Sequence, residues 1–205
     1  MPATYLATID DARLLVWELT ESIEELKNSL GELDINELDS KVSDKRKFEF
    51  LGARVALKAL LNKEITIKYD AAGKPCTADN SLQISISHSR KWIAVMVHST
   101  RLVGIDIEIP SDKIQKIYTR FLSEAEQIDL SNGENMQQLQ LAWSAKESLY
   151  KIIGNEAVDF AKQLRIFPFE VKDGGKMLGE HIPTGKQYKL RYIQQPEYTL
   201  VYCVD

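Results

Sequence analysis

The sequence predicts an α+β fold made of two successive halves. Strand-like segments gather in groups instead of alternating one by one with helices, and two long amphipathic helical patterns each lead into such a group. No clear sequence repeat is present, but this recurrence of helix followed by strands is compatible with an ancient duplication. At 205 residues the chain is long enough for one domain or for two small ones.

The predicted strands carry alternating or continuous apolar residues between turn signals. In the first half they span residues 5–9, 14–19, 65–69, 82–87 and 92–98, and in the second half 102–109, 164–171, 188–194 and 198–204. Asp10-Asp11 joins the first two strands, and Gly73-Lys74-Pro75 reads as a turn. Gly174-Gly175 and Pro183 are expected to interrupt the last group of strands.

The predicted helices have recognisable ends. Ser22 and Glu25 form a capping box for a short helix that Gly31 would end, and Ser123 caps another. Gly154 would stop a long helix. The helices are expected after Ser22 and over 44–62, 113–121, 124–130 and 135–153.

The long helix over 44–62 has an apolar stripe and a basic face. Its apolar stripe comprises Phe50, Ala53, Leu57, Leu60 and Leu61. Lys47, Arg54 and Lys58 recur along the other face. These cations either serve solubility alone or contact an anion.

Charge is unevenly distributed along the chain, although the net charge is −4. Residues 41–101 contain 12 Lys and Arg against five Asp and Glu, which gives +7 there and therefore −11 elsewhere. An anionic ligand is expected to touch the basic stretch. Overall acidity, and the lack of interleaved aromatic residues or a nucleic-acid-binding motif, argue against nucleic acid, so a smaller polyanion fits better.

The sequence carries no signal for export or for a membrane. Residues 1–11 have neither a basic nor an apolar leader region, and the longest uninterrupted apolar stretch, 92–97, is too short to span a bilayer. Cys76 and Cys203 lie far apart without a metal-binding spacing. We therefore expect a cytoplasmic protein without a disulfide framework or a zinc site.

Residues 104–108, Gly-Ile-Asp-Ile-Glu, predict a strand with one acidic face. Side chains at i and i+2 share a face, so Asp106 and Glu108 point together. Gly104 shares that face and would let a ligand approach the backbone. Magnesium prefers such oxygen ligands together with substrate phosphate oxygens. The alternative is an edge strand that carries acids for solubility.

Residues 143–151, Trp-Ser-Ala-Lys-Glu-Ser-Leu-Tyr-Lys, place a second acid on the last long helix. Trp143, Glu147 and Lys151 recur at i, i+4 and i+8 on one face, opposite an apolar stripe of Leu141, Ala145, Leu149 and Ile152. If that face meets the acidic strand, Glu147 completes a three-carboxylate metal site. Lys146 or Lys151 would then offset phosphate charge. We expect Lys151 to keep the pKa of Glu147 low and Trp143 to pack the helix. The alternative is an ordinary Glu-to-Lys helix pair.

The two segments together resemble the signature motifs of the 4′-phosphopantetheinyl transferases, which are a Gly-Ile-Asp-Ile-Glu strand and a Trp-Ser-x-Lys-Glu-Ser helix ending in Lys. The resemblance includes Gly73-Lys74-Pro75 and Ile84-Ser85-Ile86-Ser87-His88-Ser89, and it covers roughly residues 46–155 well. It implies the class that activates surfactin synthetase (Sfp-type), a single chain of two similar α/β halves with pseudo-twofold symmetry and the active site in the cleft between them. The halves would span 1–101 and 102–205.

The resemblance implies Mg²⁺-dependent transfer of phosphopantetheine from coenzyme A to a serine of an apo acyl carrier protein or a peptidyl or polyketide carrier domain. Adenosine 3′,5′-bisphosphate would leave. Asp106, Glu108 and Glu147 would bind magnesium, Glu147 would also be the base, and Lys151 and Asp106 would assist catalysis. A metal-bound water or Asp106 remains open as the base.

The resemblance also implies contacts to the nucleotide of coenzyme A in the basic half. The expected residues are Lys74, Pro75, Ser87, His88, Arg46 and Arg54, together with Lys151 from the other half. His88 would bind a phosphate, although a lone loop histidine is more often structural. We expect a monomer that binds neither nucleic acid nor membrane, because the related trimeric class has half-sized subunits.

Two alternatives stay open at this point. A magnesium-dependent hydrolase of coenzyme A or another nucleotide diphosphate would use the same acids with water replacing serine. A non-catalytic module that binds coenzyme A or a carrier would be expected to have lost a motif carboxylate, and all three are present. The carrier that is served, from fatty-acid, polyketide, siderophore or peptide synthesis, does not follow from the sequence.

Overall fold

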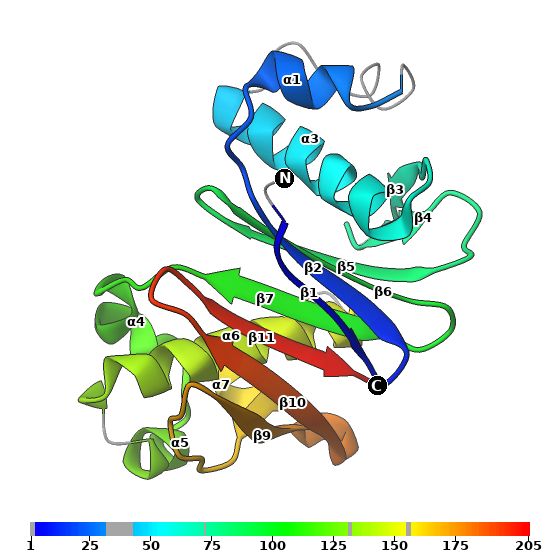
Figure 1. Cartoon of the computed structure of the whole chain (residues 1–205). Coiled ribbons are helices and arrows are strands. Elements are labelled where there is room, and N and C mark those ends of the chain that lie inside the picture. The colour runs from blue at the N-terminus through cyan, green and yellow to red at the C-terminus, as the bar shows by residue number, and fades with distance from the viewer. Residues whose placement is uncertain (1–2, 32–42, 72, 131–132, 155–156) are drawn as a thin grey trace. The chain divides into compact units, whose positions relative to one another are not determined.

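The computed structural model describes residues 3–31, 43–71, 73–130, 133–154 and 157–205. The chain divides into two compact units, Met1–Arg101 and Leu102–Asp205. Each unit has its own antiparallel sheet, its own long helix and its own apolar core (Figure 1). The predicted α+β class is confirmed, and each unit is described by itself.

The first unit contains a six-stranded sheet in the order β1-β2-β6-β5-β4-β3. Its strands are β1 (Ala3–Ile9), β2 (Ala12–Glu18), β3 (Ile67–Tyr69), β4 (Pro75–Thr77), β5 (Gln83–Ser89) and β6 (Trp92–His98). Asp10 and Asp11 take positive φ values of 50° and 66°, which suits the tight hairpin turn between β1 and β2. The predicted turn at 73–75 ends one residue early, since Pro75 already pairs with Tyr69 in the sheet.

Among the described residues of the first unit, two helices accompany this sheet, α1 (Ile23–Asn28) and α3 (Asp44–Leu61). The predicted capping box of Ser22 and Glu25 is present, although α1 ends before Gly31, with Ser29 as its C-cap. The apolar stripe of α3 packs on strand residues such as Leu15, Trp17 and Val95 to form the core. This burial supplies the main driving force for folding of the unit.

The second unit contains a five-stranded sheet in the order β7-β11-β10-β9-β8. Its strands are β7 (Val103–Glu108), β8 (Leu164–Ile166), β9 (Gly174–His181), β10 (Lys186–Gln194) and β11 (Thr199–Val204). The expected break at Gly174-Gly175 is wrong, because these glycines begin β9. A Cβ on Gly175 would meet the Tyr192 hydroxyl oxygen at 2.8 Å and the nearest ring carbon at 2.9 Å, so the glycine leaves room for the tyrosine of the neighbouring strand.

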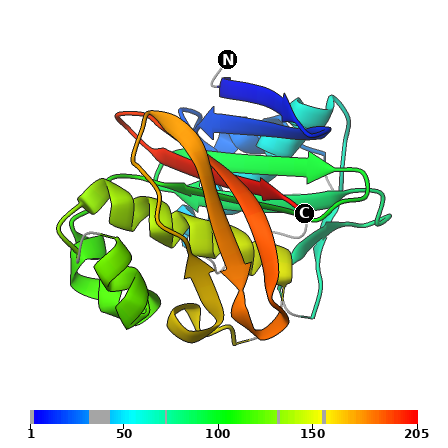
Figure 2. The same cartoon turned by 90° about the horizontal axis from the view of Figure 1, so that it is seen from below.

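In the described part of the second unit, four α-helices accompany the sheet, namely α4 (Lys113–Phe121), α5 (Glu124–Asp129), α6 (Met136–Ile153) and the short α7 (Phe160–Gln163), which the sequence analysis missed. The long helix α6 runs across one face of the sheet (Figure 2). Asn135 caps its start, and Gly154 ends it in the left-handed conformation at φ 63°. Its apolar stripe is fully buried, as predicted. No helix among the described residues is long and apolar enough to cross a membrane.

Candidate functional site

The acidic strand and the acidic helix meet within the second unit. A Cβ built on Gly104 would lie 2.1 Å from the backbone oxygen of Ser148 on α6. The missing side chain therefore lets α6 cross β7 at backbone contact, and the expectation that a ligand fills this space is wrong. The Ser148 hydroxyl donates to the Val201 carbonyl at 3.0 Å and fixes α6 on the neighbouring strand. The acids of the two elements are brought together beside this crossing.

Lys151 bridges the two elements next to the acids. Its ammonium group donates to the backbone carbonyl of Ile105 at 2.8 Å and to Asp106 Oδ1 at 3.0 Å. Asp106 is buried and Lys151 is partly buried. A charge-assisted hydrogen bond in such a setting is stronger than one at the surface. The strand carboxylate and the helix cation therefore form an ion pair that connects β7 to α6.

Glu147 lies in the same electrostatic environment. Burial is the largest cause that raises the pKa of Glu147 to about 7, and the charge of Asp106 adds to it. Lys151 lowers the pKa and Glu108 raises it slightly. The expectation that Lys151 keeps this pKa low is therefore wrong. Burial and two neighbouring carboxylates outweigh one ammonium group that already pairs with Asp106.

The chemistry of these donors suits a hard divalent cation. Glu147, whose pKa is raised by burial and by the charges of Asp106 and Glu108, is unfavourable in its ionised form until a positive charge offsets it. Asp106, Glu108 and Glu147 would be the residues that hold such an ion. Among the described residues, however, no group of three or more His, Cys, Asp and Glu side chains is arranged as a preformed metal site.

Gln140, which lies two helical turns before Glu147 on α6, was missed by the sequence analysis. Its amide nitrogen donates to the carbonyls of Glu108 at 3.2 Å and Ile109 at 2.9 Å, which holds the end of β7 on α6. A cavity of about 220 Å³ opens beside Glu108, with Gln140, Trp143 and Ile114 in its lining. Only the position of Gln140 three residues before Trp143, on the same helix face, could have signalled it.

Trp143 packs as predicted, but Lys146 does not behave as expected. The indole of Trp143 lies against Phe121, with ring centroids 5.1 Å apart, and against Phe160. Lys146 has an exposed fraction of 0%, so it is too deeply buried to offset the charge of a phosphate. The sequence analysis did not choose between Lys146 and Lys151, because Lys146 lies one residue before Glu147 and Lys151 lies four residues after it, about one helical turn away.

The Lys146 ammonium group has four hydrogen-bond acceptors, each 2.7–2.8 Å away. One is Glu126 of α5, and the other three are the backbone carbonyls of Phe121, Phe160 and Leu164. Glu126 in turn accepts from the backbone N–H of Ile166 at 2.8 Å. Burial lowers the pKa of Lys146, but the Glu126 carboxylate and the acceptor set favour the charged form. Lys146 therefore fastens α6 to four other segments, one residue before Glu147.

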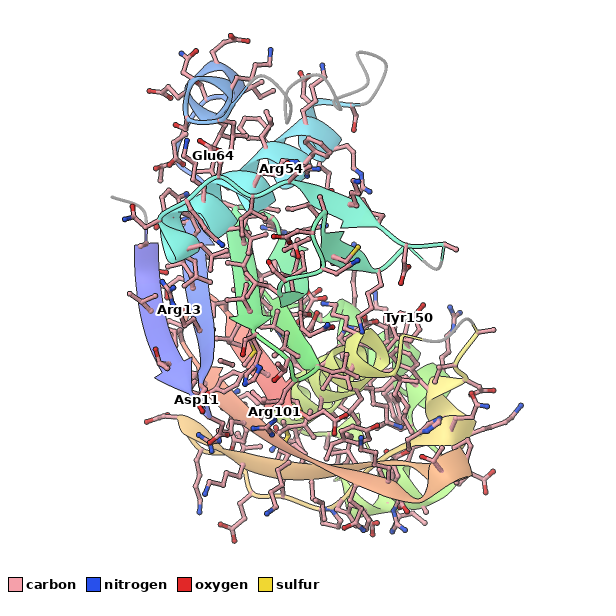
Figure 3. All side chains as sticks on the ribbon, turned by 90° about the vertical axis from the view of Figure 1, so that its right-hand side faces the viewer. Asp11, Arg13, Arg54, Glu64, Arg101 and Tyr150 are labelled. Atoms are coloured by element: carbon pink, nitrogen blue, oxygen red, sulfur yellow. The ribbon has the colours of Figure 1, made fainter. Side chains whose placement is uncertain are left out.

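The basic residues predicted in the first unit have different environments. Arg54, labelled on α3 in Figure 3, is 2% exposed and its guanidinium lies 3.4 Å from the centre of the Phe50 ring. The alternative that the basic face serves solubility alone is thus wrong at Arg54. Ser87 is buried and His88 is exposed. Lys74 is partly buried, and this burial lowers its pKa despite the nearby Asp70.

Arg46 and His88 are brought to one carboxylate. Glu49 of α3 lies 3.5 Å from Arg46 Nη1 and 3.4 Å from His88 Nδ1. The sequence analysis did not single out Glu49, although its position three residues after Arg46 is typical of a helix ion pair. Whether these residues, Lys74 or Pro75 contact a nucleotide stays a prediction.

Comparison with known proteins identifies the second unit. Residues 102–203 match the family model of the 4′-phosphopantetheinyl transferase superfamily. The matched residues run from β7 into β11 and include the strand acids, Glu147 and Lys151. A search of curated proteins found no match.

Proposed function

We propose, since residues 102–203 form a domain of the 4′-phosphopantetheinyl transferase superfamily, that the protein transfers the 4′-phosphopantetheine arm of coenzyme A to a serine of an apo carrier protein. The single observation that carries this proposal is the meeting of β7 and α6. It places Glu147 where the charges of Asp106, Glu108 and Lys151 all act on it. Phosphoryl transfer needs such an arrangement of charges around the reacting diphosphate.

In the proposed reaction, the serine oxygen forms a bond to the phosphorus that carries pantetheine. The bond from this phosphorus to the bridging oxygen breaks, and adenosine 3′,5′-bisphosphate leaves with that oxygen. Glu147 accepts the serine proton, and Lys151 donates to a phosphate oxygen while keeping Asp106 in place. Mg²⁺ bound by Asp106, Glu108 and Glu147 would neutralise the diphosphate.

We propose that the basic first unit binds the nucleotide. Lys74, with Pro75 fixing its turn, and His88 would contact phosphate oxygens, while Arg46 adds positive charge. Their exposure or partial burial supports this role. Arg54 and Ser87 would act from buried positions, by supporting the helix and strand that carry Arg46 and His88. The Sfp-type class, the monomeric state and the cytoplasmic location are part of the same proposal.

The test is to incubate the protein with coenzyme A, Mg²⁺ and a panel of apo carrier proteins, and then to weigh the carriers intact. We expect one or more carriers to gain phosphopantetheine in step with release of adenosine 3′,5′-bisphosphate. Chelation of the metal with EDTA should stop the gain. Nucleotide release without any carrier would instead establish a hydrolase. Binding of coenzyme A without turnover on any carrier would establish a binding module.

A further inference from the structure

Glu49 lies at the centre of a cluster of cations in the first unit. Lys45 Nζ is 3.8 Å, Arg46 Nη1 3.5 Å and His88 Nδ1 3.4 Å from its carboxylate oxygens. We call Lys45, Arg46, Glu49 and His88 the Glu49 cluster. The Glu49 side chain is only 10% exposed, whereas those of Arg46 and His88 are 66% and 38% exposed. The anion is therefore at the base of the cluster, and the cations reach solvent around it.

Helix stability alone does not account for this arrangement. Lys45 and Arg46 precede Glu49 by four and three residues on α3, and such pairs are common on helix surfaces. His88, in contrast, comes from β5 and needs no partner on α3 for its strand to form. Glu49 thus connects α3 to an exposed histidine near the end of β5.

The charges of the cluster match a phosphate monoester. With His88 protonated, three cations and one carboxylate give a net charge of +2, and a phosphate monoester carries about −1.5 to −2 at pH 7. Coenzyme A has one such group, on its ribose. Its diphosphate is the part that a divalent cation at the acids of the second unit would hold. The ribose phosphate needs cations that act without a metal.

The orientation of the imidazole ring follows from Glu49. Since Nδ1 faces the carboxylate, Nε2 lies on the opposite side of the ring. A doubly protonated ring can then donate Nδ1–H to Glu49 and Nε2–H to a phosphate oxygen. The carboxylate offsets the charge of the imidazolium, as the acid does in a carboxylate–histidine pair of an enzyme.

We propose that Glu49 is a positioning residue that holds His88 ready to bind the ribose phosphate of coenzyme A. This inference rests on the proposed function and deepens it. Glu49 touches no ligand itself. Its effect on affinity passes through His88, so the two residues should not contribute independently.

The experiment measures dissociation constants by calorimetry for coenzyme A and for dephospho-coenzyme A, which lacks the ribose phosphate. The variants are Glu49→Gln, His88→Ala and the double variant. Asp44→Asn is the matched control, because it removes one carboxylate from the same helix, where Asp44 pairs with Lys47. Steady-state transfer to an apo carrier gives KM and kcat for each variant.

We expect Glu49→Gln to weaken coenzyme A binding about fivefold or more, and His88→Ala about tenfold, as for loss of one charge-assisted hydrogen bond. In the His88→Ala background, Glu49→Gln should change the affinity less than about twofold. Dephospho-coenzyme A affinity, kcat and the Asp44→Asn control should stay near wild type. The loss should therefore appear in KM for coenzyme A.

Three results would overturn the inference while leaving the proposed function standing. They are unchanged or tighter coenzyme A binding by Glu49→Gln, an equal loss in the His88→Ala background, and an equal loss for dephospho-coenzyme A. In each case the wild-type protein still modifies a carrier. A wild-type protein that binds no coenzyme A and modifies no carrier would overturn the proposed function, and this inference with it.

Discussion

The two units share one topology but differ in what lies between strand and helix. In the first unit β2 is followed by helices and then by four strands that return to it in the order β2-β6-β5-β4-β3. In the second unit β7 is followed by helices and by four strands in the corresponding order β7-β11-β10-β9-β8. Within the described parts of the two units, the only additional strand is β1, which pairs with β2. This match supports the duplication that the sequence only suggested.

The long helices match as well. Each of α3 and α6 has 18 residues and ends in a left-handed cap, at Asn62 and Gly154. Counted from the first helical residue, Arg54 and Lys146 hold the same position, and both are buried cations. A buried charge is costly without partners, so its presence at one position in both helices points to a shared requirement.

The strands that face these helices differ. On the face toward the long helix, β2 carries Leu15 and Trp17, which belong to the core. The corresponding face of β7 carries Gly104, Asp106 and Glu108. β7 is also an edge strand, so side chains of α6 can bind its carbonyls, whereas β1 covers β2. The same topology therefore carries an apolar strand face in the first unit and an acidic one in the second.

The strongest test of the shared buried cation is Lys146→Met. It leaves the Glu126 carboxylate buried without its partner, which typically costs about 3–5 kcal/mol of unfolding free energy. We expect a large fall in the stability of the second unit by denaturant unfolding. The double variant Lys146→Met/Glu126→Gln should recover part of the loss, since no charge then remains buried. Equal stability of wild type and Lys146→Met would show that the cation is dispensable.

The role of the acids where β7 meets α6 is tested by Glu147→Gln. Loss of a general base commonly lowers the rate about a hundredfold or more, because an amide cannot accept the serine proton. We expect almost no carrier modification at any Mg²⁺ concentration, with coenzyme A still bound. Glu197→Gln is the matched control, since Glu197 is exposed in the turn between β10 and β11. Substantial turnover at saturating Mg²⁺ would leave Glu147 as a ligand only.

Local signals predicted most elements of this fold. The capping box of α1, the Ser123 cap of α5 and the end of α6 at Gly154 were predicted, because capping depends on residues close in sequence. β4, β9 and α7 were not, since they are short or contain glycines that tertiary packing explains. The need for glycine at position 175 comes from Tyr192, a residue of another strand.

The candidate site was predictable to the same extent. Periodicity placed Asp106 and Glu108 on one face and Glu147 and Lys151 on another, and the structure brings Asp106, Glu147 and Lys151 together. It did not separate the buried Lys146 from Lys151, nor reveal Gln140, Glu126 or Glu49. Their roles depend on carbonyls and side chains from distant segments, which no local pattern encodes. The pKa of Glu147 was misjudged because burial, its largest cause, is a tertiary property.

The backbone contact between β7 and α6 is tested by Gly104→Ala. Its Cβ would lie 2.1 Å from a backbone oxygen, which cannot give way without moving α6. We expect a loss of about 1–3 kcal/mol, together with loss of transfer activity as Glu147 shifts. Gly179→Ala is the matched control on β9, where the new Cβ would meet the flexible end of Leu149 at 2.7 Å. If both variants lose the same stability, the backbone contact has no special role.

The smallest effect concerns the charge of Glu147 in the metal-free protein. The folded-state pKa of about 7 lies above the ordinary value of 4.5, so the folded state binds more protons than the unfolded state between these pH values. Stability from this group is complete below pH 4.5 and is lost as the pH rises through 7. At pH 8 the ionised Glu147 opposes folding, whereas Gln at this position carries no charge. In EDTA, Glu147→Gln should therefore raise Tm by a few degrees at pH 8, about 1 kcal/mol, and leave it nearly unchanged at pH 5.

Added Mg²⁺ should raise the Tm of wild type more than that of the variant, because the cation removes the repulsion. The Asp44→Asn variant, whose change lies in the other unit, should show no such pH dependence. Thermal unfolding at both pH values would decide, and a Tm difference that is the same at pH 5 and pH 8 would show that the acids of the second unit do not repel one another in the folded protein.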